Sequence, residues 1–507
     1  MAVGAEKQQW SSRWTFMFAA VSSAVGLGNI WRFPFTAHDN GGGAFIIPYF
    51  VAVFLVGVPL MVLEFVYGSK HKGTTPLAFA RVGKKYEFIG WIPALLGGGI
   101  IFYYGVILVW AMNYAVFAAT KAWGTNTAAF FLNDYLQVSG NALRPGSVIW
   151  PNLLGLVFLW GVSYFVLSKD LKKGLEKVNK IVLPLMLVSA IALIIRGVTL
   201  DNAMLGLNAL FTPNFPALAD PNVWLAAFGQ AMFSLSLCMG IMVTYSSYLK
   251  KGSEIVNLSY VVAFADVIFA FLFSVGIFAI LGYLAGAQGV AVSDVATGGA
   301  GLVFITLPVA LNHMGAAGYA LGVIFFAMLA VTGWTSFLSL MEAFIAPMGE
   351  KFGWVRKKTY KILCGIGFCL SLVYVTGAGQ IILGLVDFAI SNIGLTSVGV
   401  LQALVAAWLA RKLPEFQAYG NANTLPYFRL GNLWLFCIRF FTPGVIGITL
   451  LMTLFNFFIG TAPGVIAART TPEVVVFVGG TIFVVLVASL LLSRVKWQVS
   501  LENYEKE

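Results

Sequence analysis

Residues 22–35, which read SSAVGLGNIWRFPF, lie inside the first long apolar run of the chain and cannot form an unbroken helix. Gly26 and Gly28 weaken the helix in mid-span, and Pro34 lacks the backbone N–H that would continue the hydrogen-bond ladder. Because hydrocarbon offers no partner for a freed backbone group, such a break is tolerated only where protein packs around it or where it lines a cavity. The segment therefore predicts a binding site at membrane depth.

The composition places the rest of the chain in a membrane as well. Of its 507 residues, 59% are hydrophobic and only 10% are charged, whereas soluble domains carry roughly 25% charged residues. About twelve apolar runs reach the length of about 20 residues that a spanning helix needs. They lie near 14–37, 43–69, 88–120, 148–167, 175–198, 222–248, 256–286, 316–347, 360–378, 381–410, 431–460 and 473–493. The first run is followed by further spans and lacks a small-residue cleavage site, so we do not expect a removable signal peptide.

The net charge of +11 follows from membrane topology. If the N-terminus is cytoplasmic and the sides alternate, most Lys and Arg fall on the inner side, which is the positive-inside pattern and places both termini in the cytoplasm. We therefore expect the protein to lie in a lipid bilayer, and we do not expect these charges to bind nucleic acid. The inner basic residues include Lys84, Lys85, Lys172, Lys173, Lys250, Lys251, Lys351, Arg356, Lys357 and Lys358.

Cysteine and histidine give no sign of a disulfide framework or a metal centre. The four cysteines all fall within predicted spans and the three histidines are scattered, so neither residue type predicts a bridge or a cluster. An intramembrane enzyme would need a nucleophile with a base, or a metal cluster, at membrane depth. Because the sequence offers neither, we expect no enzyme. The residues are Cys238, Cys364, Cys369, Cys437, His38, His71 and His313.

A second polar, helix-weakening patch interrupts the sixth apolar run at residues 233–240, which read FSLSLCMG. Spans 1 and 6 are thus both interrupted, and a separation of five spans puts them in opposite orientations across the membrane. Corresponding interrupted helices in two halves of a chain are typical of an inverted-repeat transporter whose site lies between them. The alternative is that these small residues serve only close helix packing.

The first-span residues 28–49, GNIWRFPFTAHDNGGGAFIIPY, closely resemble the signature of neurotransmitter:sodium symporters. Further matches follow in order along nearly the whole chain. The short outer loops and termini are similar to the bacterial amino-acid transporter branch. The matches are residues 73–76 (GTTP), 103–104 (YY), 174 with 184, 233–236 (FSLS), 244–248, 304–308 (FITLP), 333–336 (GWTS) and 439–443.

The resemblance implies an all-α polytopic membrane protein of about twelve transmembrane helices. The fold that the resemblance implies is the LeuT type, a 5+5 inverted repeat in which helices 1 and 6 are unwound in mid-membrane. In this chain, one transporter domain would comprise a cytoplasmic gate segment (1–12), repeat 1 (13–198), repeat 2 (222–411), helices 11 and 12 (426–494) and a cytoplasmic tail (495–507). It also implies sodium-driven uptake of amino acids by alternating access.

Carried over residue by residue, the resemblance implies a substrate pocket and two Na⁺ sites, because sodium is a hard cation that takes oxygen ligands. The substrate would lie among Ala24, Gly26, Leu27, Gly28, Ile100, Tyr104, Phe233, Ser234, Ser236, Met239, Ser336 and Leu340. The first Na⁺ site would use Ala24, Asn29, Ser234 and Asp266. The second would use Ser22, Val25, Thr332, Thr335 and Ser336.

Asp266 departs from the family, which usually has Asn at this position. A carboxylate deep in a span is costly and by default functional. Some relatives need chloride, held partly by a Ser one turn further on, where this chain has Ala270. We therefore expect Asp266 to supply a permanent negative charge and transport to be independent of chloride.

The resemblance also implies two gates. Arg32 and Asp387 match an extracellular ion pair with Phe233 beneath it, and each predicts the other because an unpaired buried charge is costly. Two intramembrane carboxylates, Glu64 and Glu342, are expected to brace the broken helices. The inner gate would comprise Lys7, Trp10, Ser247, Tyr248 and Glu350.

We expect a sodium-coupled importer of neutral, hydrophobic α-amino acids in a bacterial inner membrane, because the predicted pocket holds no fixed charge for a charged side chain. Two alternatives stay open. One is uptake of an amino-acid derivative such as a betaine or an ω-amino acid. The other is an amino-acid sensor that binds its ligand without transporting it.

Overall fold

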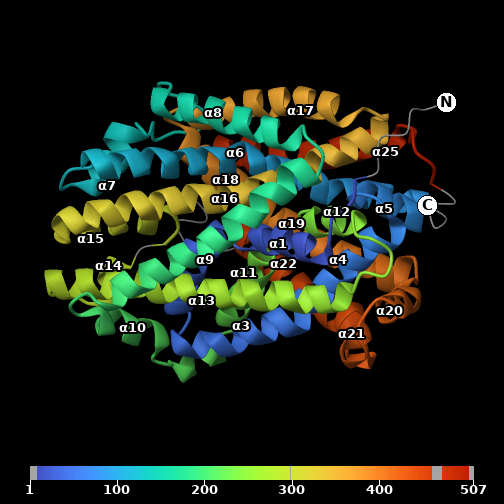
Figure 1. The fold of residues 1–507 in the computed structure, drawn as a ribbon, viewed down its shortest axis with the longest axis horizontal. Helices are drawn as coiled ribbons and strands as arrows, with labels where there is room; N and C mark the ends of the chain where they lie inside the picture. Colours follow the sequence, from blue (N-terminus) through green and yellow to red (C-terminus); the bar gives the residue numbers. More distant parts are fainter. Residues whose placement is uncertain (1–7, 297, 460–470, 502–507) are drawn as a thin grey trace.

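The computed structural model describes residues 8–296, 298–459 and 471–501, and helices dominate them. The described chain has no named strand, only two isolated bridges, Gly42 with Pro213 and Val148 with Thr376. Most helices run along the long axis of the molecule, and both termini lie at the same end (Figure 1). The all-helical prediction is confirmed.

Ten helices among the described residues are long and apolar enough to cross a membrane. They are Gly43–His71, Lys84–Thr120, Trp150–Leu167, Lys172–Val198, Ile255–Gln288, Gly315–Phe352, Arg356–Val375, Gly379–Leu409, Pro426–Phe458 and Pro472–Arg494. The first and sixth predicted spans are absent from this set because each is broken into pieces shorter than a span. That these broken pieces also cross, giving twelve crossings, stays a prediction, as do the boundaries of the two repeats.

Short turns and π-helical segments divide several spans, so the individual helices are more numerous than the spans. Their bounds are α1 (Arg13–Ala24), α2 (Phe33–Asp39), α3 (Ile46–Ala52), α4 (Val58–His71), α5 (Thr75–Val82), α6 (Glu87–Thr120), α7 (Thr127–Ala129), α8 (Trp150–Leu167), α9 (Lys177–Val198), α10 (Ala203–Phe211), α11 (Pro221–Ser234), α12 (Ile241–Ser247), α13 (Ile255–Gln288), α14 (Val292–Val295), α15 (Leu307–His313), α16 (Gly315–Phe352), α17 (Arg356–Ser371), α18 (Gly379–Asp387), α19 (Leu395–Leu404), α20 (Leu413–Ala422), α21 (Asn432–Phe436), α22 (Thr442–Phe458), α24 (Pro472–Val474) and α25 (Gly480–Arg494).

The helix of the first predicted span stops at Ala24, the last residue of α1. Val25 takes an extended conformation, with φ −75° and ψ 99°, and a π-helical turn over Gly28–Arg32 then leads into α2. The break therefore falls in the glycine-containing stretch where the sequence predicts it, between the last turn of α1 and Gly28.

The sixth predicted span breaks between α11 and α12, and its connecting loop is strained. Ser236 and Cys238 have φ of +53° and +66°. This left-handed conformation is energetically unfavourable for any residue that carries a side chain. The loop is held in place by Glu64, whose Oε1 accepts hydrogen bonds from the Cys238 backbone N–H at 2.8 Å and from Gln402 Nε2 at 2.9 Å. Glu64 thus braces this break, as the sequence predicts.

Close packing fixes α12 against α4. A Cβ on Gly68 would lie 2.0 Å from the carbonyl oxygen of Val243, so any side chain at this position would push the two helices apart. The neighbouring helices α6 and α16 pack along each other over much of their length and form the centre of the bundle. The two broken spans are therefore held between elements that pack closely.

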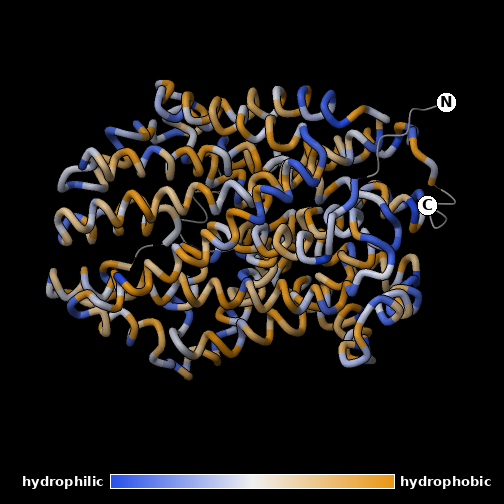
Figure 2. Tube along the Cα trace, viewed as in Figure 1, coloured by the Kyte–Doolittle hydropathy of each residue, from blue (hydrophilic) through white to orange (hydrophobic). Residues whose placement is uncertain are grey.

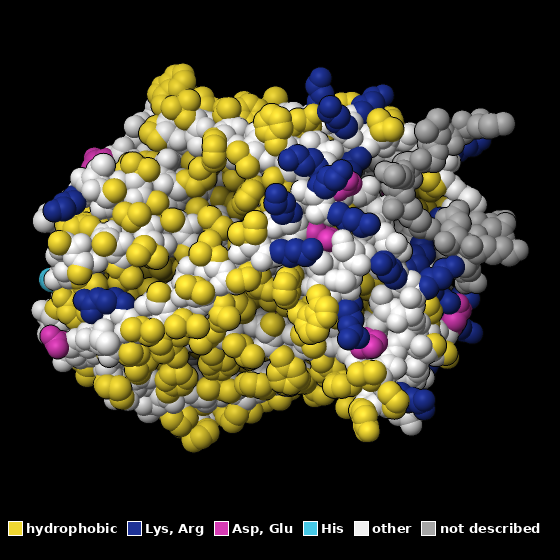
Figure 3. Space-filling view, viewed as in Figure 1, with side chains coloured by type: hydrophobic (Ala, Val, Ile, Leu, Met, Phe, Trp, Pro, Cys, Tyr) yellow, Lys and Arg dark blue, Asp and Glu magenta, His cyan; other side chains and the backbone are white. Residues whose placement is uncertain are grey.

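Apolar side chains cover the sides of the bundle. Exposed residues such as Ile181 and Val188 on α9, and Phe455 on α22, face outward. Hydrophobic residues run along the length of most helices (Figure 2). Lys and Arg gather toward the end that carries both termini (Figure 3). This surface is that of an integral membrane protein.

Lys351, one of the basic residues counted on the inner side, is buried. Its side chain is 0% exposed and pairs with the equally buried Glu87 at the start of α6. Trp497, beyond α25, covers the pair, since the Lys351 ammonium lies 4.2 Å from the Trp497 ring centroid. Trp497 also stacks on Trp91, and the Arg81 guanidinium donates to the Ser500 carbonyl at 2.9 Å. The last described residues are thus docked on the ends of α5, α6 and α16.

Candidate functional site

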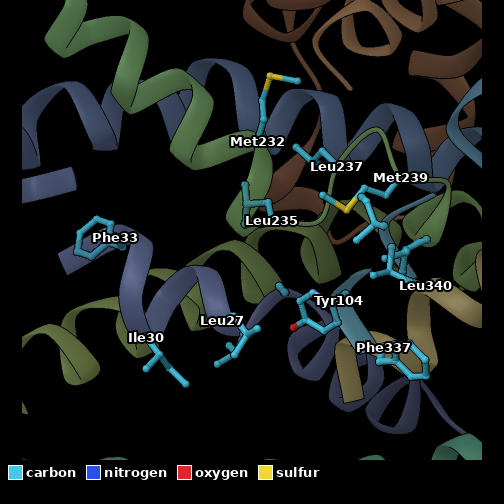
Figure 4. Packing of buried hydrophobic residues seen from close by; sticks show 14 of the residues in the cluster. Leu27, Ile30, Phe33, Tyr104, Met232, Leu235, Leu237, Met239, Phe337 and Leu340 are labelled. Carbon is cyan, nitrogen blue, oxygen red and sulfur yellow. The ribbon is translucent and has the colours of Figure 1, made fainter. Parts of the chain in front are cut away.

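The two helix breaks open onto one cavity of about 450 Å³. All twelve residues that the sequence predicts around a substrate line this cavity, and they come from the two broken spans, α6 and α16. Around it, Tyr104, Met239 and Leu340 lie near the break that carries Leu27 (Figure 4). Residues far apart in the sequence are therefore brought to a single site.

Gly26 forms a narrow part of the cavity wall. A Cβ at this position would lie 2.8 Å from Ser336 Oγ and 3.5 Å from the Tyr104 hydroxyl oxygen. The carbonyl of Ser23, just before the break, accepts hydrogen bonds from Ser236 Oγ at 3.0 Å and from Ser336 Oγ at 3.1 Å. One backbone oxygen thus joins both broken spans to α16.

A buried polar cluster lies beside the cavity. Asp266 on α13 accepts hydrogen bonds from Asn29 Nδ2 at 2.7 Å and from Ser234 Oγ at 2.7 Å, and all three side chains are almost fully buried. The side-chain members of the first predicted Na⁺ site are therefore in contact with one another. The cluster links α13 to both helix breaks.

The amide nitrogen of Asn29, and not its oxygen, faces the buried cluster. Its oxygen accepts the Gly26 backbone N–H at 3.1 Å, and its nitrogen faces Asp266 and Ser234. The physical reason is that a buried carboxylate takes the strongest donor within reach. An Na⁺ site here would use the amide oxygen. A rotation of the Asn29 amide by half a turn about its Cβ–Cγ bond would bring that oxygen into the cluster.

The residues of the second predicted Na⁺ site meet where α16 passes the end of α1. Thr335 Oγ1 lies 3.0 Å from the Ser22 carbonyl oxygen and 2.7 Å from the Thr332 carbonyl oxygen. A hydroxyl has a single proton, so it cannot donate fully to both carbonyls. The buried hydroxyls of Ser22 and Thr332 have no hydrogen-bond partner among the described residues. A set of oxygens this rich in acceptors fits a hard cation.

The outer gate residues line the same cavity but are not joined. The Arg32 guanidinium lies 4.6 Å from the ring centroid of Phe233. Asp387 accepts hydrogen bonds from Tyr103 at 2.6 Å and from Ser391 at 2.8 Å. Between these two described residues the predicted ion pair is not formed, because each is held by other neighbours.

At the opposite end, the inner gate residues are packed shut. Trp10 is buried, its indole N–H donates to the Tyr245 carbonyl at 2.8 Å, and its backbone N–H donates to the Tyr248 carbonyl at 3.1 Å. Ser247 donates within α12 to the Thr244 carbonyl. Lys7 lies outside the described residues.

Glu350, the acidic member of the inner gate, is also engaged. Its Oε2 accepts the Thr74 hydroxyl at 2.5 Å and the Thr74 backbone N–H at 3.1 Å. These bonds tie the end of α16 to the residue before α5. The predicted inner gate residues are thus held together by hydrogen bonds, whereas the predicted outer pair of Arg32 and Asp387 is not formed.

The sequence reasoning missed the partner of Glu342. Arg356, at the start of α17, forms a bidentate pair with this fully buried carboxylate at 2.8 and 2.7 Å. Tyr248 donates to the same carboxylate at 2.9 Å, as does Tyr360. An intramembrane carboxylate requires a partner, which was the available signal, but positive-inside counting assigns Arg356 to a loop.

Comparison with known proteins agrees with this geometry. The sequence model of the sodium:neurotransmitter symporter family matches residues 7–128 and 124–498. The chain belongs to this family. As a member of the sodium:neurotransmitter symporter family, it is a sodium-dependent symporter that moves a small molecule across a membrane, and the family consists of transporters.

Individual relatives share most of the length of this symporter. A sodium-dependent transporter of Methanocaldococcus jannaschii is 36% identical over 440 residues, which cover 86% of this chain and 88% of that protein. The sodium- and chloride-dependent GABA transporter 2 of Mus musculus is 29% identical, with 89% and 81% covered. The crystal structure of MhsT in complex with L-phenylalanine superposes with a TM-score of 0.74 at 32% identity, covering 88% of this chain and 99% of MhsT. The fold is of the LeuT type.

Proposed function

We propose that this symporter imports neutral, hydrophobic α-amino acids with Na⁺ by alternating access, and that it does so without chloride. The observation that carries the proposal is the position of the two helix breaks. They face a single cavity and flank the buried Asp266–Asn29–Ser234 cluster. Backbone groups freed from a helix can bind a carboxylate and a cation at membrane depth.

The lining of the cavity supports an apolar side chain on the substrate. Ile100, Ile107, Met239 and Leu340 contribute apolar surface, while the charged Arg32 and Asp387 belong to the gate. A charged substrate side chain among the apolar residues would lose its hydration without gaining a partner. The free-energy cost of burying such an unpaired charge is on the order of several kcal/mol. The related MhsT was crystallised with L-phenylalanine, which agrees with this substrate class.

The donor sets described above support two Na⁺ sites. Asn29, Ser234 and Asp266 would hold one ion together with the carbonyl of Ala24. The carbonyls of Ser22 and Thr332 and the hydroxyl of Thr335 would hold the other, with Val25 and Ser336 completing it. The Na⁺ ions would supply the driving force, and these residues would couple ion binding to the conformation of the two breaks.

The hydrogen-bonded inner gate residues and the unformed outer ion pair fit an alternating-access cycle that starts facing outward. The orientation proposed for this cycle places both termini in the cytoplasm of a bacterial cell with the protein in its inner membrane. The concentration of Lys and Arg at the end that carries the termini supports this orientation.

Uptake of an ω-amino acid or a betaine is the second candidate function. It is favoured by the curated relatives whose names specify GABA or taurine as the substrate, at 28–29% identity. A binding protein that does not transport is a further alternative. Each of these two alternatives predicts a different result from the main proposal when a panel of substrates is tested for uptake.

Sodium-driven uptake into proteoliposomes tests the substrate class. We expect leucine, methionine and phenylalanine to compete for uptake at least about tenfold better than GABA, taurine or betaine, since an apolar side chain gains about 1.5–3 kcal/mol on burial. Lysine and glutamate are expected not to compete. If betaine or GABA displaces every α-amino acid, the second candidate function holds instead. Saturable binding without accumulation would indicate a sensor.

Replacing chloride tests the role of Asp266. The relatives from mammals are named as chloride-dependent, whereas this chain places a carboxylate beside Asn29 and Ser234, with Ala270 one turn further along α13. Because the fixed charge can balance a bound Na⁺, we expect the initial uptake rate to change less than about twofold when gluconate replaces chloride. Complete loss of uptake in gluconate would show that the anion is required.

A further inference from the structure

The outer end of the cavity contains a contact that the ion-pair description of the gate does not include. Tyr103, one residue before Tyr104 on α6, is buried, and its hydroxyl donates to Asp387 Oδ1 at 2.6 Å. Ser391 donates to the same oxygen at 2.8 Å. Asp387 is thus tied to α6, the helix that packs along α16 in the centre of the bundle.

Arg32 belongs to a different part of the molecule, the π-helical turn that follows the break of the first span. Its guanidinium is stacked on Phe233, next to the break of the sixth span. Among the described residues, Asp387 forms no ion pair with Arg32, although both side chains line the cavity. The two gate charges are therefore held apart, each by its own neighbours.

The hydrogen bonds to Asp387 oppose closure of this gate. A carboxylate that is already satisfied by two hydroxyl donors gains less from an incoming guanidinium than one that lacks them, and hydrogen bonds to a charged group are among the stronger ones. A tie to α6 also resists displacement of Asp387 toward Arg32. Both effects favour the open arrangement.

We propose that Tyr103 is a positioning residue that holds the outer gate open by retaining Asp387, with Ser391 as a weaker second tie. Closing then requires Asp387 to give up the Tyr103 hydroxyl in exchange for the Arg32 guanidinium. Removing the hydroxyl favours the closed gate, so the substrate site becomes less accessible from outside. The proposal rests on the gate of the proposed function, but it concerns the position of Asp387 and not the identity of the substrate.

Accessibility of a cysteine below the gate tests the proposal. Ile100→Cys places a thiol on the cavity wall one helical turn from Tyr103. The background carries Cys369→Ser, because the other three described cysteines are buried. The rate of modification by a charged methanethiosulfonate is measured on purified protein in Na⁺ without an amino acid. We expect Tyr103→Phe to slow this rate about tenfold, as loss of one hydrogen bond to a charged group implies.

A control and a second background separate positioning from packing. Tyr374 packs edge-on against Tyr103, with ring centroids 6.2 Å apart, so Tyr374→Phe is the matched control and should leave the rate unchanged. In an Asp387→Ala background, Tyr103→Phe should have no further effect, because no side-chain oxygen is left at position 387 to accept the Tyr103 hydroxyl. A slowing that persists in that background would mean that Tyr103 acts through packing, and would overturn the proposal.

Other results also decide the matter. An unchanged or faster modification rate in Tyr103→Phe would overturn the proposal, whereas about threefold slowing in Ser391→Ala would support it independently if Tyr103→Phe does not fold. No slowing in Ser391→Ala would then count against it. In the protein that carries Ile100→Cys and an unchanged Tyr103, an added amino acid should protect the thiol from modification. This protection tests the proposed function, so a failure of that function is seen separately.

Discussion

Asp266→Asn is expected to reduce sodium-driven uptake by about a hundredfold or more. The substitution keeps the size of the side chain but removes the only charge in the cluster with Asn29 and Ser234. A charge about 4 Å from Na⁺ contributes about 4 kcal/mol at an effective dielectric constant of 20, so its loss weakens ion binding severely. Initial uptake rates over a range of Na⁺ concentrations measure the effect as a rise in the Na⁺ concentration for half-maximal uptake.

The matched control is Asp201→Asn, the same change at an exposed aspartate before α10. It should transport at the rate of the parent protein. Uptake by Asp266→Asn within about threefold of the parent, in medium free of chloride, would show that the carboxylate is not needed for Na⁺ binding. Restoration of uptake by chloride alone would show that a mobile anion can replace it.

Arg356→Ala is expected to destabilise the protein by about 3–5 kcal/mol, the cost of leaving one member of a buried pair unpaired. Glu342 is 0% exposed and receives two hydrogen bonds from the Arg356 guanidinium. Without Arg356, the donors that remain at the carboxylate within the described part of the chain are the hydroxyls of Tyr248 and Tyr360. Thermal unfolding of the purified protein, followed by tryptophan fluorescence, should show a clear drop in the apparent melting temperature.

Arg429→Ala is the control for this change, because Arg429 is exposed and lies in the segment after α20. It should leave the melting temperature unchanged. The double variant Arg356→Ala with Glu342→Gln should be more stable than Arg356→Ala alone, since no charge is then left buried. Equal melting temperatures for Arg356→Ala and the control would contradict a stabilising role for the pair.

The helix breaks could be predicted because their cause is local. Gly26, Gly28 and the left-handed Gly240 have backbone preferences that read directly from the sequence, and the structure breaks the helices next to them. The resemblance then brought Asn29 and Asp266 together across the chain, which no local rule does. Their contact at 2.7 Å agrees with that assignment, while their role in Na⁺ binding stays a prediction.

Other features depend on competition among neighbours, which the sequence does not reveal. Asn29 could face Asp266 with either end of its amide, and only the arrangement of nearby donors decides between them. Arg32 and Asp387 were expected to pair because each is costly alone, but Phe233 and Tyr103 provide alternatives.

Two basic residues show what the positive-inside rule does not predict. Lys351 and Arg356 were both counted as inner charges, and counting charges by loop predicts orientation without predicting depth. The structure places the Lys351 side chain against Glu87 and the Arg356 side chain against Glu342, both buried carboxylates. A carboxylate in an apolar span predicts that a partner exists, but the partner itself is found only by packing.

The docked chain end described above affects how the protein is best engineered for expression. Trp497 shields the Lys351–Glu87 pair, and the Ser500 carbonyl accepts a hydrogen bond from Arg81, so residues 495–501 belong to the folded body. An affinity tag or fluorescent fusion attached directly behind Arg494 would replace this cover with a foreign sequence and open a buried ion pair to water. Fusions are therefore better placed after Leu501, with a flexible linker that leaves the indole in its place.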